Sequence, residues 1–281
     1  MIPKGQLLII GGHEDKGAAT GETLNTAKRG GTQTHFEILG CLIQKIPRAH
    51  HIIEIIATAS AIPREMEALY IDSYKKEGFT HAGIIKLEND ADGSDPNSIK
   101  RIQNSHAIFF TGGDQSKLVS LLRNTPLLAA IRKKYYADKN FIVGGTSAGA
   151  MAIPETIITG GLITEALFKG DINIGNGLNL IAGIIIDTHF INRGRFTRLA
   201  HAVALNPSCT GIGLGEDTAL IISNGKTAHC MGSGMVIIID GSKIRNTNIN
   251  VSDNCTPIYI ENLSIKILTK GCLYQLKEIS D

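Results

Sequence analysis

Short apolar runs alternate along the first half of the chain with longer segments in which apolar positions recur every three or four residues. The runs have the length of buried strands, and they span residues 7–10, 51–59, 82–87, 107–110 and 141–145. Helical periodicity is clearest in the intervening residues 64–78, 97–105, 115–125 and 126–137. Strands that alternate with helices predict an α/β fold, with a mostly parallel sheet and helices on both faces.

The pattern changes beyond Gly211, where strand-length runs are separated by polar turns. Asn224-Gly225 and Asp240-Gly241 are dipeptides that favour tight hairpins. We therefore expect the C-terminal part to add antiparallel strands to the edge of the same sheet. Since no repeat or low-complexity linker interrupts the sequence, we expect residues 1–281 to form a single domain.

Composition excludes several classes of protein. Apolar residues make up 43% of the 281 residues and charged residues 19%, which is typical of a globular protein. A net charge of +2 disfavours a general nucleic-acid-binding protein, which needs a concentrated basic face. No apolar stretch approaches the length of a membrane span, and the N-terminal run is too short for a signal-peptide core, so we expect a cytoplasmic protein. The five cysteines are scattered without a CxxC pair, which predicts reduced packing residues with no zinc or disulfide role.

Functional residues of an open α/β sheet are found just beyond the carboxyl ends of the strands. Four polar motifs lie there: GGHEDK, TGGDQ, GGTSAGA and DTHFINRGR. The third contains GxSxG around Ser147, the pattern of a nucleophile elbow, whose sharp strand-to-helix turn leaves room only for small neighbours. The start of the helix then aims free N–H groups at the point where an oxyanion forms. The alternative is a glycine-rich turn with an incidental serine.

A serine nucleophile needs a base, and histidine is the usual one because its pKa lies near working pH. His189 stands at the end of the IAGIII run, in the position of the crevice, which makes it the leading base among nine histidines. A carboxylate should orient the imidazole, and Glu165, Asp171 and Asp187 are the candidates. Glu165 follows paired glycines that let its segment fold back over the site, whereas Asp187 lies two residues before His189 on the same face of the strand. The residues alone leave this choice open.

Two other enzyme classes share parts of these motifs. The glycines of IIGGHEDKG follow a strand, as in dinucleotide-binding proteins, but the full GxGxxG fingerprint and its acidic partner are missing, so we expect no nicotinamide cofactor. An α/β-hydrolase esterase shares GxSxG and the order serine, acid, histidine. That fold separates the elbow from its base by several further strands, whereas His189 follows Ser147 by only 42 residues.

Several motifs together resemble the cyanophycinases, within the serine peptidase family that includes the α-aspartyl dipeptidases. The similarity runs from about Leu7 to Ile222 and is carried by GGTSAGA, IFFTGGDQ, ATAS with the later YKKEGF, and DTHF with NRGRFTRL. The resemblance implies a class I glutamine-amidotransferase-like α/β fold, usually dimeric, whose serine attacks a peptide bond. It also implies Ser147 as the nucleophile, His189 as the base and Glu165 as the acid.

The TGGDQ loop gains a role in this interpretation. An N–H group of Gly113 or Asp114 is expected to join that of Ala148 in the oxyanion hole, where loss of one donor typically costs about 3 kcal/mol of transition-state stabilisation. The alternative is an ordinary turn in which Asp114 caps the following helix. The two roles are compatible.

The resemblance also suggests what the site binds, because cyanophycinases cleave a poly-aspartate backbone that bears β-linked arginine and release β-aspartyl-arginine. The side chains expected to contact substrate are Gln115, Asp187, Thr188, Arg193, Arg195 and Arg198. Arginine forks suit the carboxylates of such a substrate, although a run of charges is also typical of a solvated face. Asp187 either pairs with a substrate guanidinium or anchors the arginines from inside.

Two details qualify the resemblance. Many family members have DQHF where this chain has DTHF, so Thr188 removes one contact that a long amide could make. Residues 215–219, GEDTA, resemble a late acidic motif of the family, for which a turn near the sheet edge is the alternative interpretation.

The sequence therefore predicts a cytoplasmic, homodimeric serine exopeptidase that cuts cyanophycin through an acyl-enzyme. We expect no cofactor, no metal, and neither nucleic acid nor a membrane as a partner. An α-aspartyl dipeptidase on the same fold and a non-catalytic anion-binding protein are the alternatives.

Overall fold

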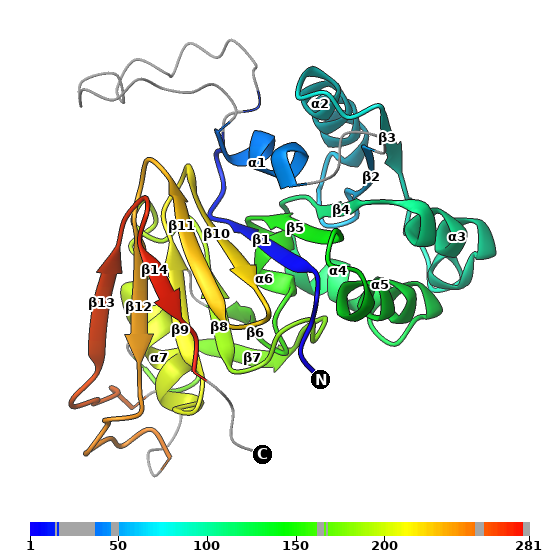
Figure 1. Cartoon of the computed structure of the whole chain (residues 1–281). Coiled ribbons are helices and arrows are strands. Elements are labelled where there is room, and N and C mark those ends of the chain that lie inside the picture. Colours follow the sequence, from blue (N-terminus) through cyan, green and yellow to red (C-terminus); the bar gives the residue numbers. More distant parts are fainter. Residues whose placement is uncertain are drawn as a thin grey trace.

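The structure is a computed structural model that describes residues 1–14, 16, 37–45, 51–161, 166, 168–250 and 256–277. Its largest element is an eight-stranded sheet (Figure 1). In spatial order its strands are β14 (Leu273–Gln275), β11 (Thr227–Gly232), β10 (Thr218–Ser223), β1 (Gln6–Ile10), β5 (Ile142–Thr146), β4 (Ala107–Phe110), β2 (Ile52–Ile56) and β3 (His81–Ile84).

Five neighbouring strands of this sheet, from β1 to β3 in that order, are parallel. The alternation of apolar runs and helical segments predicts this arrangement, and the structure confirms it. β1 and β5 lie side by side, with Ile10 paired to Thr146 at their carboxyl ends. This register brings the residues that follow β1 next to Ser147, which follows β5.

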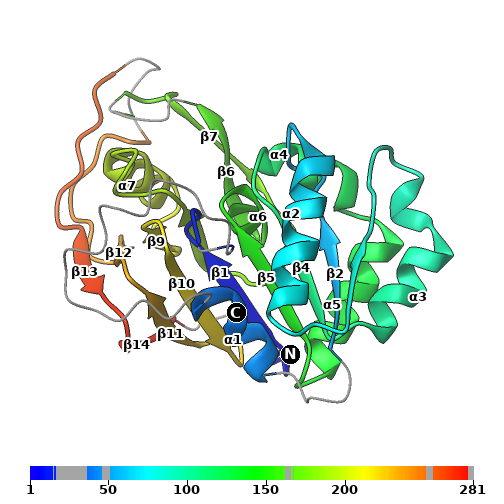
Figure 2. The same ribbon diagram turned by 90° about the horizontal axis from the view of Figure 1, so that it is seen from above.

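Helices cover both faces of the sheet (Figures 1 and 2). Successive side chains of a strand point to opposite faces, so Leu8 and Ile10 belong to one apolar core while Leu7 and Ile9 belong to another. The first core is covered by α1 (Glu37–Lys45) and α2 (Pro63–Lys76). The second is covered by α3 (Pro96–Asn104), α4 (Gln115–Leu122), α5 (Pro126–Ala137) and α6 (Ala148–Ala152), with a short 3₁₀ helix at Asp92–Ser94 before α3.

The C-terminal strands differ from the expectation in part. Asn224-Gly225 forms the predicted tight hairpin between β10 and β11, with the positive φ angles of 55° and 63° that such a turn requires. Asp240-Gly241 does not form one, because residues 241–263 separate the two strands that it was expected to join. β12 (Val236–Asp240) and β13 (Ser264–Leu268) still pair antiparallel, with Asp240 opposite Ser264, but a long connection joins them in place of a tight turn.

The C-terminal strands β10, β11 and β14 extend the edge of the first sheet by antiparallel pairing, as expected, whereas β12 and β13 belong to a second sheet. Its order is β13 (Ser264–Leu268), β12 (Val236–Asp240), β9 (Thr210–Leu214) and β8 (Ile184–Asp187). β9 is buried along its whole length and packs against α7 (Phe196–Leu205), which explains why it does not join an exposed sheet edge. A separate two-stranded ribbon is formed by β6 (Thr156–Gly161) and β7 (Ile172–Asn176).

The connections after β1, β5 and β8 meet at one end of the two sheets. The backbone N–H of His189, just beyond β8, donates to the carbonyl of Gly11, just beyond β1. The backbone N–H of Ser147, just beyond β5, donates to the carbonyl of Ile10. Among the helices that the structure describes, none is long and apolar enough to cross a membrane.

Candidate active site

Ser147 occupies the sharp turn between β5 and α6. Its φ of 51° and ψ of −121° are a strained backbone conformation for a residue other than glycine. A side chain at Gly145 would meet the backbone of Gly149 at 2.7 Å, so the turn closes only with glycine there. The strand–turn–helix form that GxSxG predicts is therefore present, and it leaves Ser147 partly exposed.

His189 lies against the nucleophile. Its Nε2 atom is 2.9 Å from Oγ of Ser147, which is hydrogen-bond distance. The ring is buried, and the backbone has a positive φ of 48° where the chain leaves β8. The two residues that the sequence identified as nucleophile and base are thus brought together from different strands.

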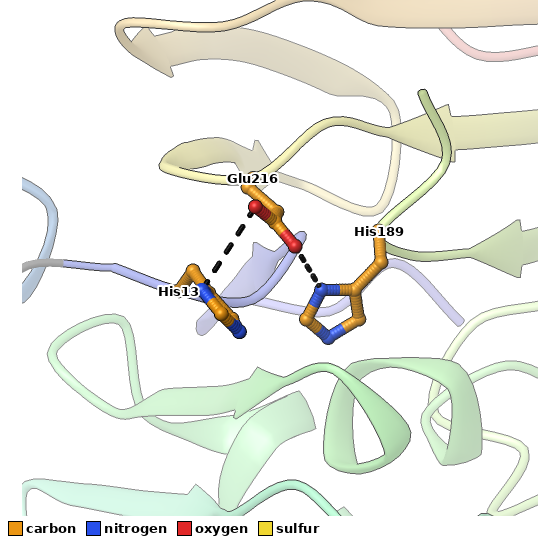
Figure 3. Close-up of side chains that lie close together, drawn as sticks. All are labelled: His13, His189 and Glu216. Carbon is orange, nitrogen blue, oxygen red and sulfur yellow. Dashed lines mark hydrogen bonds and ion pairs between the residues drawn. The ribbon is translucent and has the colours of Figure 1, made fainter. Parts of the chain in front are cut away.

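The partner of the other ring nitrogen is a residue that the sequence did not identify as catalytic. Nδ1 of His189 is 2.8 Å from Oε1 of Glu216, which lies in the turn between β9 and β10 (Figure 3). The second oxygen, Oε2, accepts a 2.8 Å hydrogen bond from the Asn192 side chain. Glu165, the carboxylate that the resemblance implied, lies outside the described residues. The signal for Glu216 was the GEDTA motif, which was interpreted as a turn at the sheet edge.

The other carboxylate candidates are engaged elsewhere. Asp171 accepts a hydrogen bond from the backbone N–H of Phe168, as in a tight turn. Asp187 forms ion pairs with Arg195 and Arg198, and among the described residues no hydrogen bond joins it to the imidazole.

The surroundings of His189 act on its pKa in opposite directions. Burial lowers the pKa of the imidazole below its ordinary value, while the hydrogen bond and the negative charge of Glu216 raise it. The positive charges of Arg193 and His13 also lower it, and the net direction is downward. A neutral imidazole at neutral pH is the form that can accept a proton from serine.

A second histidine, His13, stands beside this pair. Its ring meets that of His189 edge to face, with the ring centroids 5.3 Å apart. Its Nδ1 atom is 3.9 Å from Oε2 of Glu216, and its side chain is 66% exposed. His13, His189 and Glu216 each offer a ligand atom that a metal ion could bind. His13 belongs to the GGHEDK motif, which the sequence marks as a crevice segment.

Of the three expected oxyanion donors, two remain available. The backbone N–H of Asp114 donates to the carbonyl of Ala59 at 2.8 Å, so Asp114 is not a free donor. Its side chain instead caps α4 by accepting from Ser116 and Lys117, which is the alternative role that the sequence allowed. Within the part of the chain that the structure describes, the N–H groups of Gly113 and Ala148 have no protein acceptor. The loop lies close to the nucleophile, since a side chain at Gly112 would meet Cβ of Ser147 at 3.2 Å.

Three residues expected to bind substrate form a buried arginine cluster instead: Asp187, Arg195 and Arg198. Arg198 binds both carboxylate oxygens of Asp187, at 2.8 and 2.6 Å, and Arg195 donates to the same carboxylate at 3.0 Å. Asp187 is fully buried, and the two arginines are 6% and 5% exposed. Of the two roles considered for Asp187, the structure supports the anchor of the arginines and corrects the expectation that these side chains face substrate.

The remaining expected contacts differ in their exposure. Thr188 is fully buried, and its hydroxyl has no partner among the described residues. Arg193 is exposed, and its side chain makes no hydrogen bond or ion pair with the described part of the chain. Gln115 is half-buried and donates its amide to the carbonyl of Ile158 at 2.8 Å, which leaves the amide oxygen available.

Comparison with known proteins relates this arrangement to a peptidase family. The model of Peptidase family S51 matches residues 53–230, a range that includes Ser147, His189 and Glu216. A cyanophycinase from Synechococcus elongatus is 33% identical over 274 residues, which are 98% of this chain and 80% of that protein. A cyanophycinase from Geminocystis herdmanii is 33% identical over 226 residues, 80% of this chain and 83% of that protein. The crystal structure of a peptidase from an acI-B1 Actinobacterium shares the fold, with a TM-score of 0.67 over 98% of this chain and 97% of that one, at 20% identity.

Proposed function

Because the chain belongs to peptidase family S51 and is a serine-type peptidase, we propose that it hydrolyses cyanophycin to β-aspartyl-arginine dipeptides. The observation that supports this most is the relay of hydrogen-bond distances from Ser147 through His189 to Glu216, at 2.9 and 2.8 Å. The relatives named cyanophycinase, which align with nearly the whole chain, support the choice of substrate.

In the proposed reaction Ser147 attacks the scissile carbonyl and forms an acyl-enzyme. Oγ forms the new bond to the carbonyl carbon, and its proton passes to Nε2 of His189 and then to the leaving amine. A water molecule activated by the same nitrogen hydrolyses the ester and restores Ser147. Before each attack the neutral His189 carries its proton on Nδ1, and this N–H group donates a hydrogen bond to Glu216.

We assign the acid to Glu216. Its negative charge stabilises the imidazolium that forms when His189 takes the proton, and Asn192 fixes the orientation of the carboxylate. Glu165 remains the competing assignment from the family resemblance. Parallel measurements on Glu216→Gln and Glu165→Gln distinguish the two, because only the residue that accepts from Nδ1 should lower kcat by orders of magnitude.

The N–H groups of Ala148 and Gly113 are the proposed oxyanion donors. Ala148 is the first residue of α6, and its N–H follows directly on the nucleophile. Gly113 lies in the loop after β4, whose neighbour Gly112 approaches Ser147. Two preorganised donors on one oxygen stabilise the tetrahedral intermediate more than the planar substrate.

Arg193 and Gln115 are the proposed substrate contacts. The exposed guanidinium of Arg193 suits a carboxylate of the aspartate backbone. The free amide oxygen of Gln115 can accept from the guanidinium of a substrate arginine, since its nitrogen is already bound to Ile158. Arg195 and Arg198 contribute indirectly, by anchoring the segment that carries Arg193.

The test is incubation of the purified protein with cyanophycin, followed by identification of the products by mass spectrometry. Release of β-aspartyl-arginine by the native protein and its loss in Ser147→Ala supports the proposal. Degradation by Ser147→Ala at the native rate contradicts the mechanism. Hydrolysis of Asp-Xaa dipeptides without attack on the polymer favours the α-aspartyl dipeptidase. No labelling of Ser147 by a fluorophosphonate probe favours the anion-binding protein.

The proposal includes a cytoplasmic location, one domain over residues 1–281 and a homodimer. Free thiols at Cys41, Cys209, Cys230 and Cys272 fit a reducing compartment. Exposed apolar side chains on β13 and β14, namely Ile265, Ile267 and Leu273, offer surface for self-association. Sedimentation equilibrium tests the dimer, and a monomer at micromolar concentration contradicts it.

A further inference from the structure

Three potential metal ligands converge at the solvent side of the active site. His13 follows β1, His189 follows β8, and Glu216 lies between β9 and β10, yet one ligand atom from each lies within 4.8 Å of the other two (Figure 3). Backbone hydrogen bonds hold the three segments together. The N–H of His189 donates to the carbonyl of Gly11, and that of Asp217 donates to the carbonyl of Gly12. The fold therefore fixes the positions of the three backbone segments that carry these ligands.

The spacing fits a first-row transition metal. Zinc binds histidine nitrogen and carboxylate oxygen at about 2.0–2.2 Å, so neighbouring ligands of a tetrahedral site are separated by about 3.4 Å. The separations in the structure lie on either side of this value: Nδ1 of His189 is 2.8 Å from Oε1 of Glu216, and Nδ1 of His13 is 3.9 Å from Oε2. Since His13 is 66% exposed, its side chain can rotate to close the longer gap.

The chemistry of the ligands selects the ion. Two imidazoles and one carboxylate suit zinc, cobalt or copper, whereas magnesium and calcium prefer sites built of oxygen. The exposure of His13 leaves a route from solvent and room for a water molecule as the fourth ligand. The set has three protein ligands and one open position, which is the usual number for a zinc ion that exchanges ligands.

We propose that His13, His189 and Glu216 bind Zn²⁺ and that the bound ion reversibly inactivates the nucleophile. The ion binds to the Nδ1 lone pair of His189. In the relay this nitrogen instead carries a proton and donates a hydrogen bond to Glu216. The neutral ring must then carry its proton on Nε2. Nε2 becomes a donor to Oγ of Ser147 and can no longer accept the serine proton.

His13 is the ligand that serves the metal site alone. The relay Ser147–His189–Glu216 is complete without His13, whose ring, within the described part of the chain, makes edge contact with His189 and lies 3.9 Å from Glu216. Without His13 the ion keeps only His189 and Glu216 as protein ligands. Binding to these two also breaks the hydrogen bond between them. Metal affinity should therefore depend on His13 more than on any other exposed histidine.

The binding test uses untagged protein stripped with a chelator and then titrated with ZnSO₄ by calorimetry and with CoCl₂ by visible absorption. The variants are His13→Asn, chosen because asparagine tolerates the φ of 51° at this position, and His229→Asn, an exposed histidine on β11. Changes outside the ligand shell already weaken metal sites by about 10- to 100-fold, so we expect His13→Asn to weaken binding by at least about tenfold. His229→Asn should bind as the native protein does. Equal affinity of the native protein and His13→Asn overturns the proposal.

The inhibition test rests on the proposed serine mechanism and measures labelling of Ser147 by a fluorophosphonate as well as hydrolysis. Zinc should suppress both in the native protein, EDTA should restore both, and His13→Asn should require at least about tenfold more zinc relative to its own metal-free rate. Inhibition of both proteins at the same zinc concentration overturns the proposal. Zinc binding that depends on His13, in a protein that leaves cyanophycin intact, supports the metal site and contradicts the proposed function alone.

Discussion

The hydroxyl of Thr146 donates a 2.7 Å hydrogen bond to Oε2 of Glu14. Thr146 is the residue before the nucleophile, and Glu14 follows β1, so the bond ties the elbow to the neighbouring strand. The same carboxylate accepts a 2.5 Å bond from the hydroxyl of Tyr70 and lies 3.3 Å from the Lys16 ammonium. Glu14 is buried; the burial of Tyr70 and, after it, the negative charge of Glu14 raise the pKa of Tyr70 well above the ordinary value. The carboxylate is therefore satisfied by three donors, one of which is the residue before the proposed nucleophile.

Glu14→Gln should lower both stability and activity. The amide group turns one hydrogen-bond acceptor into a donor that faces another donor and removes the charge opposite Lys16. An unsatisfied buried polar group costs about 1–3 kcal/mol, which we expect as the loss in free energy of unfolding in urea. A small shift of the elbow should also lower kcat, by about tenfold, because a displacement of 1 Å can cost about 100-fold.

Glu88→Gln is the matched control, since Glu88 is exposed and its side chain has no hydrogen-bond partner among the residues that the structure describes. Surface changes of this kind usually alter stability by less than about 0.5 kcal/mol. If both variants unfold at the same urea concentration, the Glu14 network does not stabilise the elbow.

Gly12→Ala should strongly lower activity. Its loss of stability should be little more than the strain of placing alanine at a positive φ. Gly12 has a φ of 100°, and a methyl group there would lie 2.5 Å from Nε2 of His189. The ring must move, and kcat/KM should fall by about 100-fold or more. Gly271→Ala has a similar φ of 88° with nothing within 4 Å of the added methyl, so it carries the same backbone strain without the clash. Full activity of Gly12→Ala contradicts the geometry.

Two members of the relay could be predicted because their signals are local. Ser147 follows an apolar run and is surrounded by small residues, and His189 ends the next long apolar run. Each position is defined by its own strand, and the carboxyl ends of strands are where side chains of α/β proteins meet. The parallel strands were predictable for the same reason, since each run and each helical segment carries its own periodicity.

The acid was not predictable in this way. Glu216 reaches His189 because β10 pairs antiparallel with β1, with Ala219 opposite Ile10, which places the preceding turn over the active site. The local sequence of that turn is ordinary, and Asp217 has the positive φ common in turns. The role of Glu216 therefore comes from pairing between strands that lie far apart in the chain. The periodicity of apolar positions within a segment carries no information on which distant strand it pairs with.

The pH dependence of Ser147 labelling should identify the groups that surround His189. In the proposed mechanism the neutral imidazole is the base, so the labelling rate should fall as the pH drops through the pKa of His189, which lies below its ordinary value. Glu216 raises this pKa, so Glu216→Gln should move the acidic limb to lower pH and slow labelling throughout. Arg193 lowers it, so Arg193→Gln should move the limb to higher pH. His13 is the third charged group, and it acts in the same direction as Arg193.

Labelling rates measured from pH 4.5 to about 8 in chelator-containing buffer give this profile without a contribution from substrate binding or metal. Limbs that coincide in the native protein and both variants would show that a group other than His189 controls the reaction.

The buried arginines illustrate why a charge run is ambiguous. Arg195 and Arg198 are three residues apart at the start of α7, which is the spacing of one helix face. Such a face is usually solvated, but here both guanidinium groups bind the carboxylate of Asp187 and α7 packs against the second sheet. Arg193, two residues earlier, stays exposed.

Asp187→Asn and Arg193→Gln should therefore separate stability from binding. Asp187→Asn leaves two buried guanidinium groups without a counter-charge, and breaking a buried ion pair typically costs about 3–5 kcal/mol. We expect that loss in the free energy of unfolding. Arg193→Gln should leave stability within about 0.5 kcal/mol of the native value, because the side chain is exposed, and raise KM for cyanophycin. Urea unfolding and steady-state kinetics of both variants give the comparison. A rise in KM with unchanged stability in Asp187→Asn would show instead that Asp187 contacts substrate.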